Sequence, residues 1–285
     1  MNGGRKTERV WWQAPAPAKL NLFLKVTGRR ADGYHTLQTL FTFVDFGDTL
    51  DCEVLDSGRI ERAEMIPGVP EAQDLTLRAA RLLQARAGVR LGARLRLHKR
   101  IPIGGGLGGG SSDAATTLLV LNQLWGIHWA RSRLARLGLE LGADVPVFVG
   151  GESALAEGVG EALVPVPVPE RWYVIGTPGV SVSTRAVFSS PDLTRNSLPV
   201  KIRDFSGRKI GNDLEPVVRR MHPEVARLLD WMGEFGAARM SGSGSCCFLD
   251  FLTCHEANQM LKRFPPEYQG FVARGRQCHP LCLTG

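Results

Sequence analysis

The chain has 285 residues, of which 44% are hydrophobic, and its formal net charge at pH 7 is +7. This length is enough for one large domain or two of ordinary size, each with a real hydrophobic core. The sequence contains no run of about 18 apolar residues, and no apolar segment follows its polar first residues. We therefore expect neither a membrane span nor a signal peptide, but a soluble, cytoplasmic protein without a membrane partner.

The positive charge favours acidic partners, which include nucleotides, phosphorylated metabolites and nucleic acid. The basic residues are scattered along the chain and form no nucleic-acid-binding motif, so we expect no nucleic-acid partner. The six cysteines are sparse and contain no Cys-x-x-Cys pattern. They are predicted to be free thiols rather than disulfides or zinc ligands.

Three elements are predicted before the most unusual part of the sequence. Alternating apolar residues over 19–26 predict a strand with one buried face, on which Lys19 and Asn21 point the same way. A helix is predicted from Asp74, its N-cap, to Gly88. Residues 91–103 alternate again and predict a strand that leads into a loop with six glycines in seven positions, 104–110.

Further elements follow this glycine loop. A helix is predicted with Ser111 or Ser112 as its cap, and a second helix, capped by Ser132, runs to Gly142. Three alternating prolines between Val164 and Glu170 predict a linker, so we place two domains at 1–160 and 161–285. Strands are then predicted at 172–176 and 246–251, and helices at 223–232 and 255–264. This mixture without strict alternation is typical of the α+β class.

A glycine-rich turn that opens a helix offers unpaired N–H groups and the positive end of the helix dipole, which is typical of a phosphate site. A dinucleotide site would need a strand ending in Asp or Glu about 20 residues later, but residues 121–126 predict a helix and a turn. A Walker loop would need a lysine where Gly110 stands. Protein-kinase signatures are also missing from the sequence. The loop therefore predicts a phosphate site of another class.

The stretch from Pro102 to Ser112 closely resembles the ATP loop of the GHMP small-molecule kinases. Other stretches resemble the members of that family that phosphorylate the 2-hydroxyl of 4-diphosphocytidyl-2-C-methyl-D-erythritol in non-mevalonate isoprenoid biosynthesis. In chain order they are residues 17–22, 32–35, 142–146, 182–188, 212–216 and 240–245. The resemblance implies a two-domain α+β GHMP kinase fold with an N-terminal ATP-binding domain, a C-terminal ferredoxin-like substrate domain and the site in the cleft between them.

The resemblance also implies the activity, an ATP-dependent phosphotransfer to an alcohol, and the residues that perform it. Asp144 is implied to be the base that takes the proton of the hydroxyl, and Lys19 to orient Asp144 or the hydroxyl. Mg²⁺ is expected to arrive with ATP, with Ser111 or Ser112 available to it. The implied ATP-binding residues are Pro102, Ile103, Gly104, Gly105, Gly106, Leu107, Gly108, Gly109, Gly110, Ser111 and Ser112.

The implied substrate is a cytidine diphosphate sugar alcohol. Tyr34 and Phe188 are implied to stack on the cytosine, and His35 to form hydrogen bonds with its edge. Thr184 is implied to contact the erythritol side, and Asn21 to form a hydrogen bond with the substrate. No role is assigned to Cys278 and Cys282, and both a monomer and a homodimer remain open.

The residue patterns leave alternatives open. Asp144 could cap the next element, Lys19 could be a surface lysine, and residues 242–244 could form a tight turn or a second phosphate-facing loop. The alternative functions are a GHMP kinase for another alcohol, such as homoserine or mevalonate, and a non-catalytic GHMP-fold binding module. The base-binding residues argue against the first alternative, because those alcohols carry no base. The presence of both Lys19 and Asp144 argues against the second.

Overall fold

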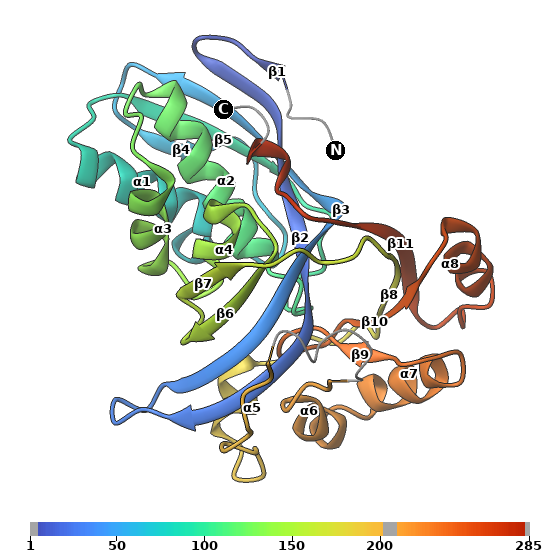
Figure 1. Ribbon diagram of the computed structural model, residues 1–285. Helices are drawn as coiled ribbons and strands as arrows, with labels where there is room; N and C mark the ends of the chain where they lie inside the picture. Colours follow the sequence, from blue (N-terminus) through green and yellow to red (C-terminus); the bar gives the residue numbers. More distant parts are fainter. Residues whose placement is uncertain (1–4, 202–209, 283–285) are drawn as a thin grey trace.

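The computed structural model describes residues 5–201 and 210–282, so the polar residues 1–4 considered above lie outside the described part. A long antiparallel hairpin of β2 (Val10–Arg29) and β3 (His35–Leu55) runs through the molecule (Figure 1). The other strands of the first half join this hairpin in one sheet: β1 (Arg5–Lys6), β4 (Ile60–Arg62), β5 (Gly92–His98), β6 (Ala154–Gly158) and β7 (Ala162–Pro165).

The predicted strand over 19–26 lies inside β2, but the expectation of a single buried face is wrong. Residues 14–24 are all buried, Lys19 and Asn21 included. The polar face is covered because two loops pack on it: the backbone N–H of Lys19 donates to Leu107 O, and that of Asn21 donates to the hydroxyl of Ser241. The polar side chains of β2 are therefore enclosed by loops from both halves of the chain.

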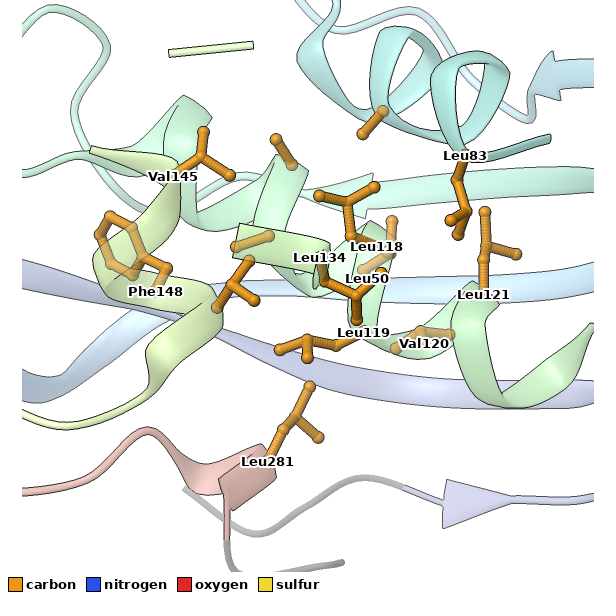
Figure 2. Close-up of a cluster of buried hydrophobic side chains, with 14 of the residues drawn as sticks. Leu50, Leu83, Leu118, Leu119, Val120, Leu121, Leu134, Val145, Phe148 and Leu281 are labelled. Atoms are coloured by element: carbon orange, nitrogen blue, oxygen red, sulfur yellow. The ribbon is translucent and has the colours of Figure 1, made fainter. Parts of the chain in front are cut away.

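Helices cover one side of the first half and bury its largest core (Figure 1). Figure 2 shows Leu118 and Leu121 of the central helix beside Leu83, Leu134 and Val145 of its neighbours. These helices are α1 (Leu75–Ala87), α2 (Gly109–Leu124), α3 (Arg131–Leu139) and α4 (Val145–Gly150); a short 3-10 helix (Glu71–Gln73) precedes α1.

The predicted limits of α1 are confirmed, and those of α3 are partly wrong. Asp74 accepts a backbone hydrogen bond in the first turn of α1, and Gly88 ends it in the left-handed region with φ 66°. Helix α3 follows the extended residue Ala130, so Ser132 lies inside its first turn instead of capping it. The helix also ends at Leu139, earlier than predicted.

The predicted cap of α2 is also wrong. The helix begins at Gly109, and its N-cap is Gly108 with φ 73°, a conformation that favours glycine. Ser112 lies within the first turn and its hydroxyl donates to Pro17 O at 2.7 Å. The Ser112 hydroxyl therefore bonds to β2, which is distant in the sequence, and does not cap the helix as the local pattern predicts.

The strand before the glycine loop is shorter than predicted, because β5 ends at His98 rather than near residue 103. The carboxylate of Asp48 accepts the backbone N–H groups of Arg100 and Ile101 at 2.5 and 2.8 Å. These N–H groups are therefore bound to a side chain, and the chain leaves the sheet before the loop begins.

The second half contains a four-stranded sheet in the order β11-β8-β10-β9. All four elements predicted for this half are confirmed, with ends that shift by a few residues. The strands are β8 (Trp172–Thr177), β9 (Arg239–Met240), β10 (Cys247–Phe251) and β11 (Gln269–Arg276). The helices are α5 (Thr184–Ser189), α6 (Glu215–Met221), α7 (Pro223–Gly233), α8 (Cys254–Leu261) and a short 3-10 helix (Pro280–Cys282).

Two segments connect the halves. The run predicted as a linker starts within β7, which pairs with β6, and then crosses to β8 (Figure 1). Strand β11 pairs with β8 over residues 269–274 and with β3 at Gly275 and Arg276. Leu281 then packs into the core of the first half (Figure 2). The last strand therefore joins both sheets, and the domain limits at 160 and 161 stay a prediction.

The structure bears on two further expectations. All six cysteines are free, as predicted. Within residues 5–201 and 210–282, no helix combines the length and the apolar character that a membrane crossing requires.

His279 makes the folded state sensitive to acid. It is fully buried, its Nδ1 accepts the N–H of Leu281 at 3.1 Å, and burial, followed by the charge of Arg131, lowers its pKa to about 3. The unfolded chain, with a histidine pKa near 6.5, binds more protons between these two values. The stability from neutral His279 is thus present above pH 6.5 and is lost progressively as the pH falls toward 3.

When the pH falls from 7 to 5, we expect the free energy of unfolding of wild type to drop by about 2 kcal/mol more than that of His279→Leu. Urea unfolding at the two pH values measures this difference. His255→Leu, at an exposed histidine, is the control and should keep the wild-type pH dependence. Equal slopes for wild type and His279→Leu would contradict the assignment of this acid sensitivity to His279.

Candidate active site

A cleft of about 530 Å³ lies between the glycine loop and the turn that joins β9 to β10. Lys19 and Asn21 of β2 line it, together with Asp144 and with two residues of α5. The predicted site residues that line the cleft are Lys19, Asn21, Pro102, Ile103, Gly104, Gly105, Gly106, Leu107, Gly108, Gly109, Gly110, Ser111, Asp144, Thr184 and Phe188. The structure therefore brings segments from both halves of the chain to one cavity.

The glycine loop is held by its carbonyl groups. Cys246 N–H donates to Gly105 O at 3.0 Å, and the Ser241 hydroxyl donates to Gly106 O at 3.0 Å. With these carbonyls bound to protein, the unpaired N–H groups at the start of α2 remain for an anion. The loop therefore has the geometry of a phosphate cradle.

The two candidate serines differ in their surroundings. Ser111 lines the cleft, whereas Ser112 is fully buried, points to β2 and does not line it. Of the two, Ser111 is the one placed to reach a ligand in the cleft.

Lys19 and Asp144 face each other in the cleft, with 3.4 Å between Nζ and Oδ2. Lys19 is 2% exposed, and its ammonium also donates to Asn21 Oδ1 and to Gly106 O. The ammonium therefore donates two hydrogen bonds within the protein and forms an ion pair with Asp144. The surface-lysine alternative is therefore wrong. The prediction that Lys19 and Asn21 point the same way is confirmed by the hydrogen bond between their side chains.

Asp144 precedes α4, but its side chain makes no capping hydrogen bond. Asp144 therefore occupies the N-cap position of α4 without a capping bond from its side chain, and the carboxylate is left to its contact with Lys19. Its side chain is 36% exposed, so it remains open to a molecule that enters the cleft. This arrangement places a carboxylate that can accept a proton beside a fixed positive charge.

Asn21 of β2 makes three hydrogen bonds, including the one with Lys19. Its Nδ2 donates to Thr39 Oγ1 at 2.8 Å, its Oδ1 accepts from Lys19, and its backbone N–H donates to Ser241 at 3.2 Å. The amide is thus oriented by strand neighbours before any ligand binds.

The predicted base-binding residues come from the far end of the hairpin and from α5 (Figure 1). The rings of His35 and Phe188 stack with 5.1 Å between their centroids and an interplanar angle of 30°. Tyr34 lies in the hairpin turn, is 68% exposed and does not line the cleft. The structure therefore brings His35 against Phe188 and leaves Tyr34 at the surface; of the three, only Phe188 lines the cleft.

Thr184 begins α5 and connects it to the turn between β9 and β10. Its hydroxyl lies 2.7 Å from the hydroxyl of Ser243. Residues 242–244 form this tight turn, as one of the two alternatives predicted, and they also line the cleft. A phosphate-facing role for them stays a prediction.

Sequence reasoning missed a buried group of charges at the entrance to the glycine loop. Lys99 binds the carboxylates of Asp48 and of Asp113, at 2.5 and 2.9 Å, and Asp48 also holds the backbone at residues 100 and 101. These contacts join β3, the start of the loop and α2. A lysine directly before the loop was the only local signal, because Asp48 lies 51 residues away in the sequence.

A second missed residue is Asn212, which belongs to a stretch quoted above without a role. Its Nδ2 donates to Met240 O at 2.9 Å and to Gly242 O at 2.7 Å, and its Oδ1 accepts the N–H of Leu214. This buried amide therefore holds the turn that faces Lys19.

Comparison with models of protein families matches residues 74–152 to the GHMP kinases N terminal domain and residues 201–268 to the GHMP kinases C terminal region. Together the two matches span more than half of the chain. The chain belongs to the GHMP kinase family. The predicted α+β GHMP kinase fold is therefore confirmed.

Within this family, several relatives with more than 50% identity share one name. The chain is 58% identical over 267 residues to the 4-diphosphocytidyl-2-C-methyl-D-erythritol kinase of Thiobacillus denitrificans, covering 94% of this chain and 96% of that protein. It is 55% identical over 288 residues to the kinase of the same name from Nitrosospira multiformis, covering 99% and 98%. These high identities group the chain with the enzymes of that name.

Two solved structures are similar to this chain, one of an enzyme with an equivalent name and one of another kinase. A crystal structure of 4-(cytidine 5'-diphospho)-2C-methyl-D-erythritol kinase superposes with a TM-score of 0.77 at 36% identity, covering 92% of this chain and 98% of that one. A homoserine kinase from Cytophaga hutchinsonii superposes with a TM-score of 0.68 at 18% identity, covering 95% and 94%. The second likeness shows the shared fold alone.

Proposed function

We propose that this protein transfers the terminal phosphoryl group of ATP to the 2-hydroxyl of 4-diphosphocytidyl-2-C-methyl-D-erythritol, giving the 2-phosphate and ADP, as in non-mevalonate isoprenoid biosynthesis. The observation that carries the proposal is the Lys19–Asp144 pair, which shares one cleft with the glycine loop and α5. Phosphoryl transfer to an alcohol needs a proton acceptor, a positive charge and a phosphate cradle, and the cleft contains all three.

In this proposal Asp144 is the general base. Its carboxylate takes the proton of the 2-hydroxyl while the new oxygen–phosphorus bond forms and the bond from the terminal phosphorus to the ADP oxygen breaks. Lys19 holds Asp144 in place, and its charge stabilises the negative charge that develops on the transferred group. Because the Lys19 ammonium is buried, water screens this charge weakly.

The glycine loop and the start of α2 are proposed to bind the phosphates of ATP. The same cleft continues past the loop to Ile66, Val69 and Leu97, whose apolar side chains suit a purine ring. The overall charge of +7 is also suited to two polyanionic substrates, because it favours their approach.

Mg²⁺ is proposed to accompany ATP, with Ser111 as its protein ligand from the loop. No cluster of three or more His, Cys, Asp or Glu side chains suitable for a metal occurs in the described part of the chain. This fits an ion that binds mainly through the phosphates of its substrate, as Mg²⁺ commonly does. When bound, the ion would neutralise part of the phosphate charge.

The test of this function is ATP turnover with four candidate alcohols: 4-diphosphocytidyl-2-C-methyl-D-erythritol, homoserine, mevalonate and galactose. We expect ADP release only with the first, and competition against it by CDP. Turnover with homoserine or mevalonate at a similar kcat/KM, or a lack of competition by CDP, would contradict the proposed substrate.

The glycine loop provides a prediction for ATP. A Cβ atom at Gly106, where φ is 75°, would lie 2.1 Å from the backbone oxygen of Ser241, so Gly106→Ala must displace the loop. We expect the KM for ATP to rise at least tenfold in steady-state kinetics. Gly179→Ala is the matched control, because Gly179 also has φ 75° but a Cβ there meets no atom within 4 Å. Equal KM values for the two variants would contradict the role of this close approach.

A further inference from the structure

Arg195, which follows α5 in the chain, contacts both residues of the observed His35–Phe188 stack. Its Nε donates to His35 Nε2 at 3.0 Å, and one terminal nitrogen donates to the backbone oxygens of Phe188 and Ser190 at 3.2 and 2.6 Å. Its other terminal nitrogen donates to Leu193 O at 3.1 Å. One half-buried guanidinium therefore holds the end of α5 against the imidazole of His35.

The direction of the Arg195–His35 bond determines where the imidazole proton lies. A guanidinium only donates hydrogen bonds and stays protonated in proteins. His35 Nε2 must therefore be the acceptor, so a neutral His35 carries its proton on Nδ1. Burial, followed by the charges of Arg195 and Arg29, lowers the pKa of His35, which keeps the ring neutral at pH 7.

We propose that Arg195 is a positioning residue that fixes His35 as the Nδ1–H tautomer, so that His35 offers a donor to the base and favours cytosine over uracil. This inference rests on the proposed function, because it concerns the base of that substrate. Cytosine presents an unprotonated N3 and an O2, both acceptors, whereas N3 of uracil carries a hydrogen. A histidine held as a donor pairs with N3 of cytosine but opposes the N3–H of uracil. A histidine free to change tautomer would serve both bases.

The fork geometry explains why arginine suits this position. One planar group reaches the His35 ring with one nitrogen and the backbone carbonyls of Phe188 and Ser190 with another, so it ties the imidazole to the end of α5 that carries Phe188. It also binds carbonyls at the end of α5 that the helix itself leaves unpaired. Arg195 thus orients the donor and supports the stacking ring together.

The experiment compares wild type with Arg195→Met, using CDP and UDP as the bound probes and the ring ¹⁵N chemical shifts of His35 as the tautomer readout. The His35 signal is assigned by its loss in His35→Asn. For wild type we expect the Nδ1–H tautomer and CDP binding at least tenfold tighter than UDP binding. For Arg195→Met we expect a mixture of tautomers, about tenfold weaker CDP binding, a CDP preference below threefold and an unchanged KM for ATP.

Two further variants make the result specific. Arg220→Met removes an arginine of α6 that pairs with exposed Asp192 at 3.1 Å, and it should behave as wild type. Arg195→Lys can still donate one hydrogen bond to His35 Nε2, so it should restore the Nδ1–H tautomer in part. If Arg195→Met fails to fold, the comparison with wild type is made with Arg195→Lys. An unchanged tautomer and an unchanged CDP-to-UDP ratio in the Arg195 variants would overturn the inference. Wild type that binds neither nucleotide would instead overturn the proposed substrate, while the ¹⁵N shifts would still test the tautomer.

Discussion

Asp144→Asn is expected to lower kcat at least a hundredfold while changing the KM for ATP less than threefold. The asparagine has nearly the same shape as the aspartate but cannot accept the proton of the hydroxyl, and removal of a general base typically costs this much. The glycine loop, which is proposed to bind ATP, does not change. Steady-state turnover with the cytidine substrate measures both parameters.

Asp56→Asn is the control for this experiment. Asp56 is an exposed carboxylate that pairs with Arg9 at 2.7 Å on the surface, so its loss should leave kcat within twofold of wild type. Comparable turnover in Asp144→Asn and wild type would remove Asp144 from the mechanism. A large rise in the KM for ATP with unchanged kcat would assign Asp144 to binding instead.

Lys19→Met is expected to lower kcat at least a hundredfold as well. Methionine nearly matches the buried stem of the lysine, but it leaves Asn21 Oδ1 without its donor, leaves Gly106 O with the Ser241 hydroxyl as donor, and removes the positive charge beside Asp144. We expect the free energy of unfolding to fall by about 1–3 kcal/mol because Asn21 Oδ1 is left unpaired, measured by urea unfolding. Lys262→Met, at an exposed lysine after α8, should change neither quantity.

The double variant Lys19→Met with Asp144→Asn tests whether the two residues act as a unit. Groups that share one catalytic step show strongly non-additive losses. We therefore expect the double variant to lose less than tenfold more in kcat than the more damaging single variant. A loss equal to the product of the two single losses would mean that Lys19 and Asp144 act independently.

Local interactions explain why much of the fold could be predicted. The limits of α1 follow from Asp74 and Gly88, whose effects reach only a few residues along the chain. Where the prediction failed, a distant partner had taken the group concerned. Ser112 donates to Pro17, 95 residues earlier in the sequence, so it does not cap α2. Asp48 holds the backbone at Arg100 and Ile101, so β5 ends early.

The same distinction applies to the candidate site. The glycine loop, the family resemblance and the identity of Lys19 and Asp144 were accessible from motifs, because each motif lies within a few consecutive residues. The contact between Lys19 and Asp144 could be expected only through the family, and the stack of His35 on Phe188 was not expected at all. Asn212 and the Asp48–Lys99–Asp113 group had no such signal, since their contacts are made with residues far along the chain.

By itself, therefore, the sequence determined the α+β class, the larger helices and part of the strands, and it located the glycine loop, because periodicity, caps and glycine runs act over short distances. The phosphate-binding and catalytic roles that it assigns stay predictions. Only the tertiary structure decided that both faces of β2 are buried and that the Asp144 carboxylate faces Lys19 without making a capping bond. It also placed Arg195 against His35, 160 residues away. The physical reason is that hydrogen bonds and ion pairs act over a few ångströms in space, and the chain topology alone determines which distant residues come that close.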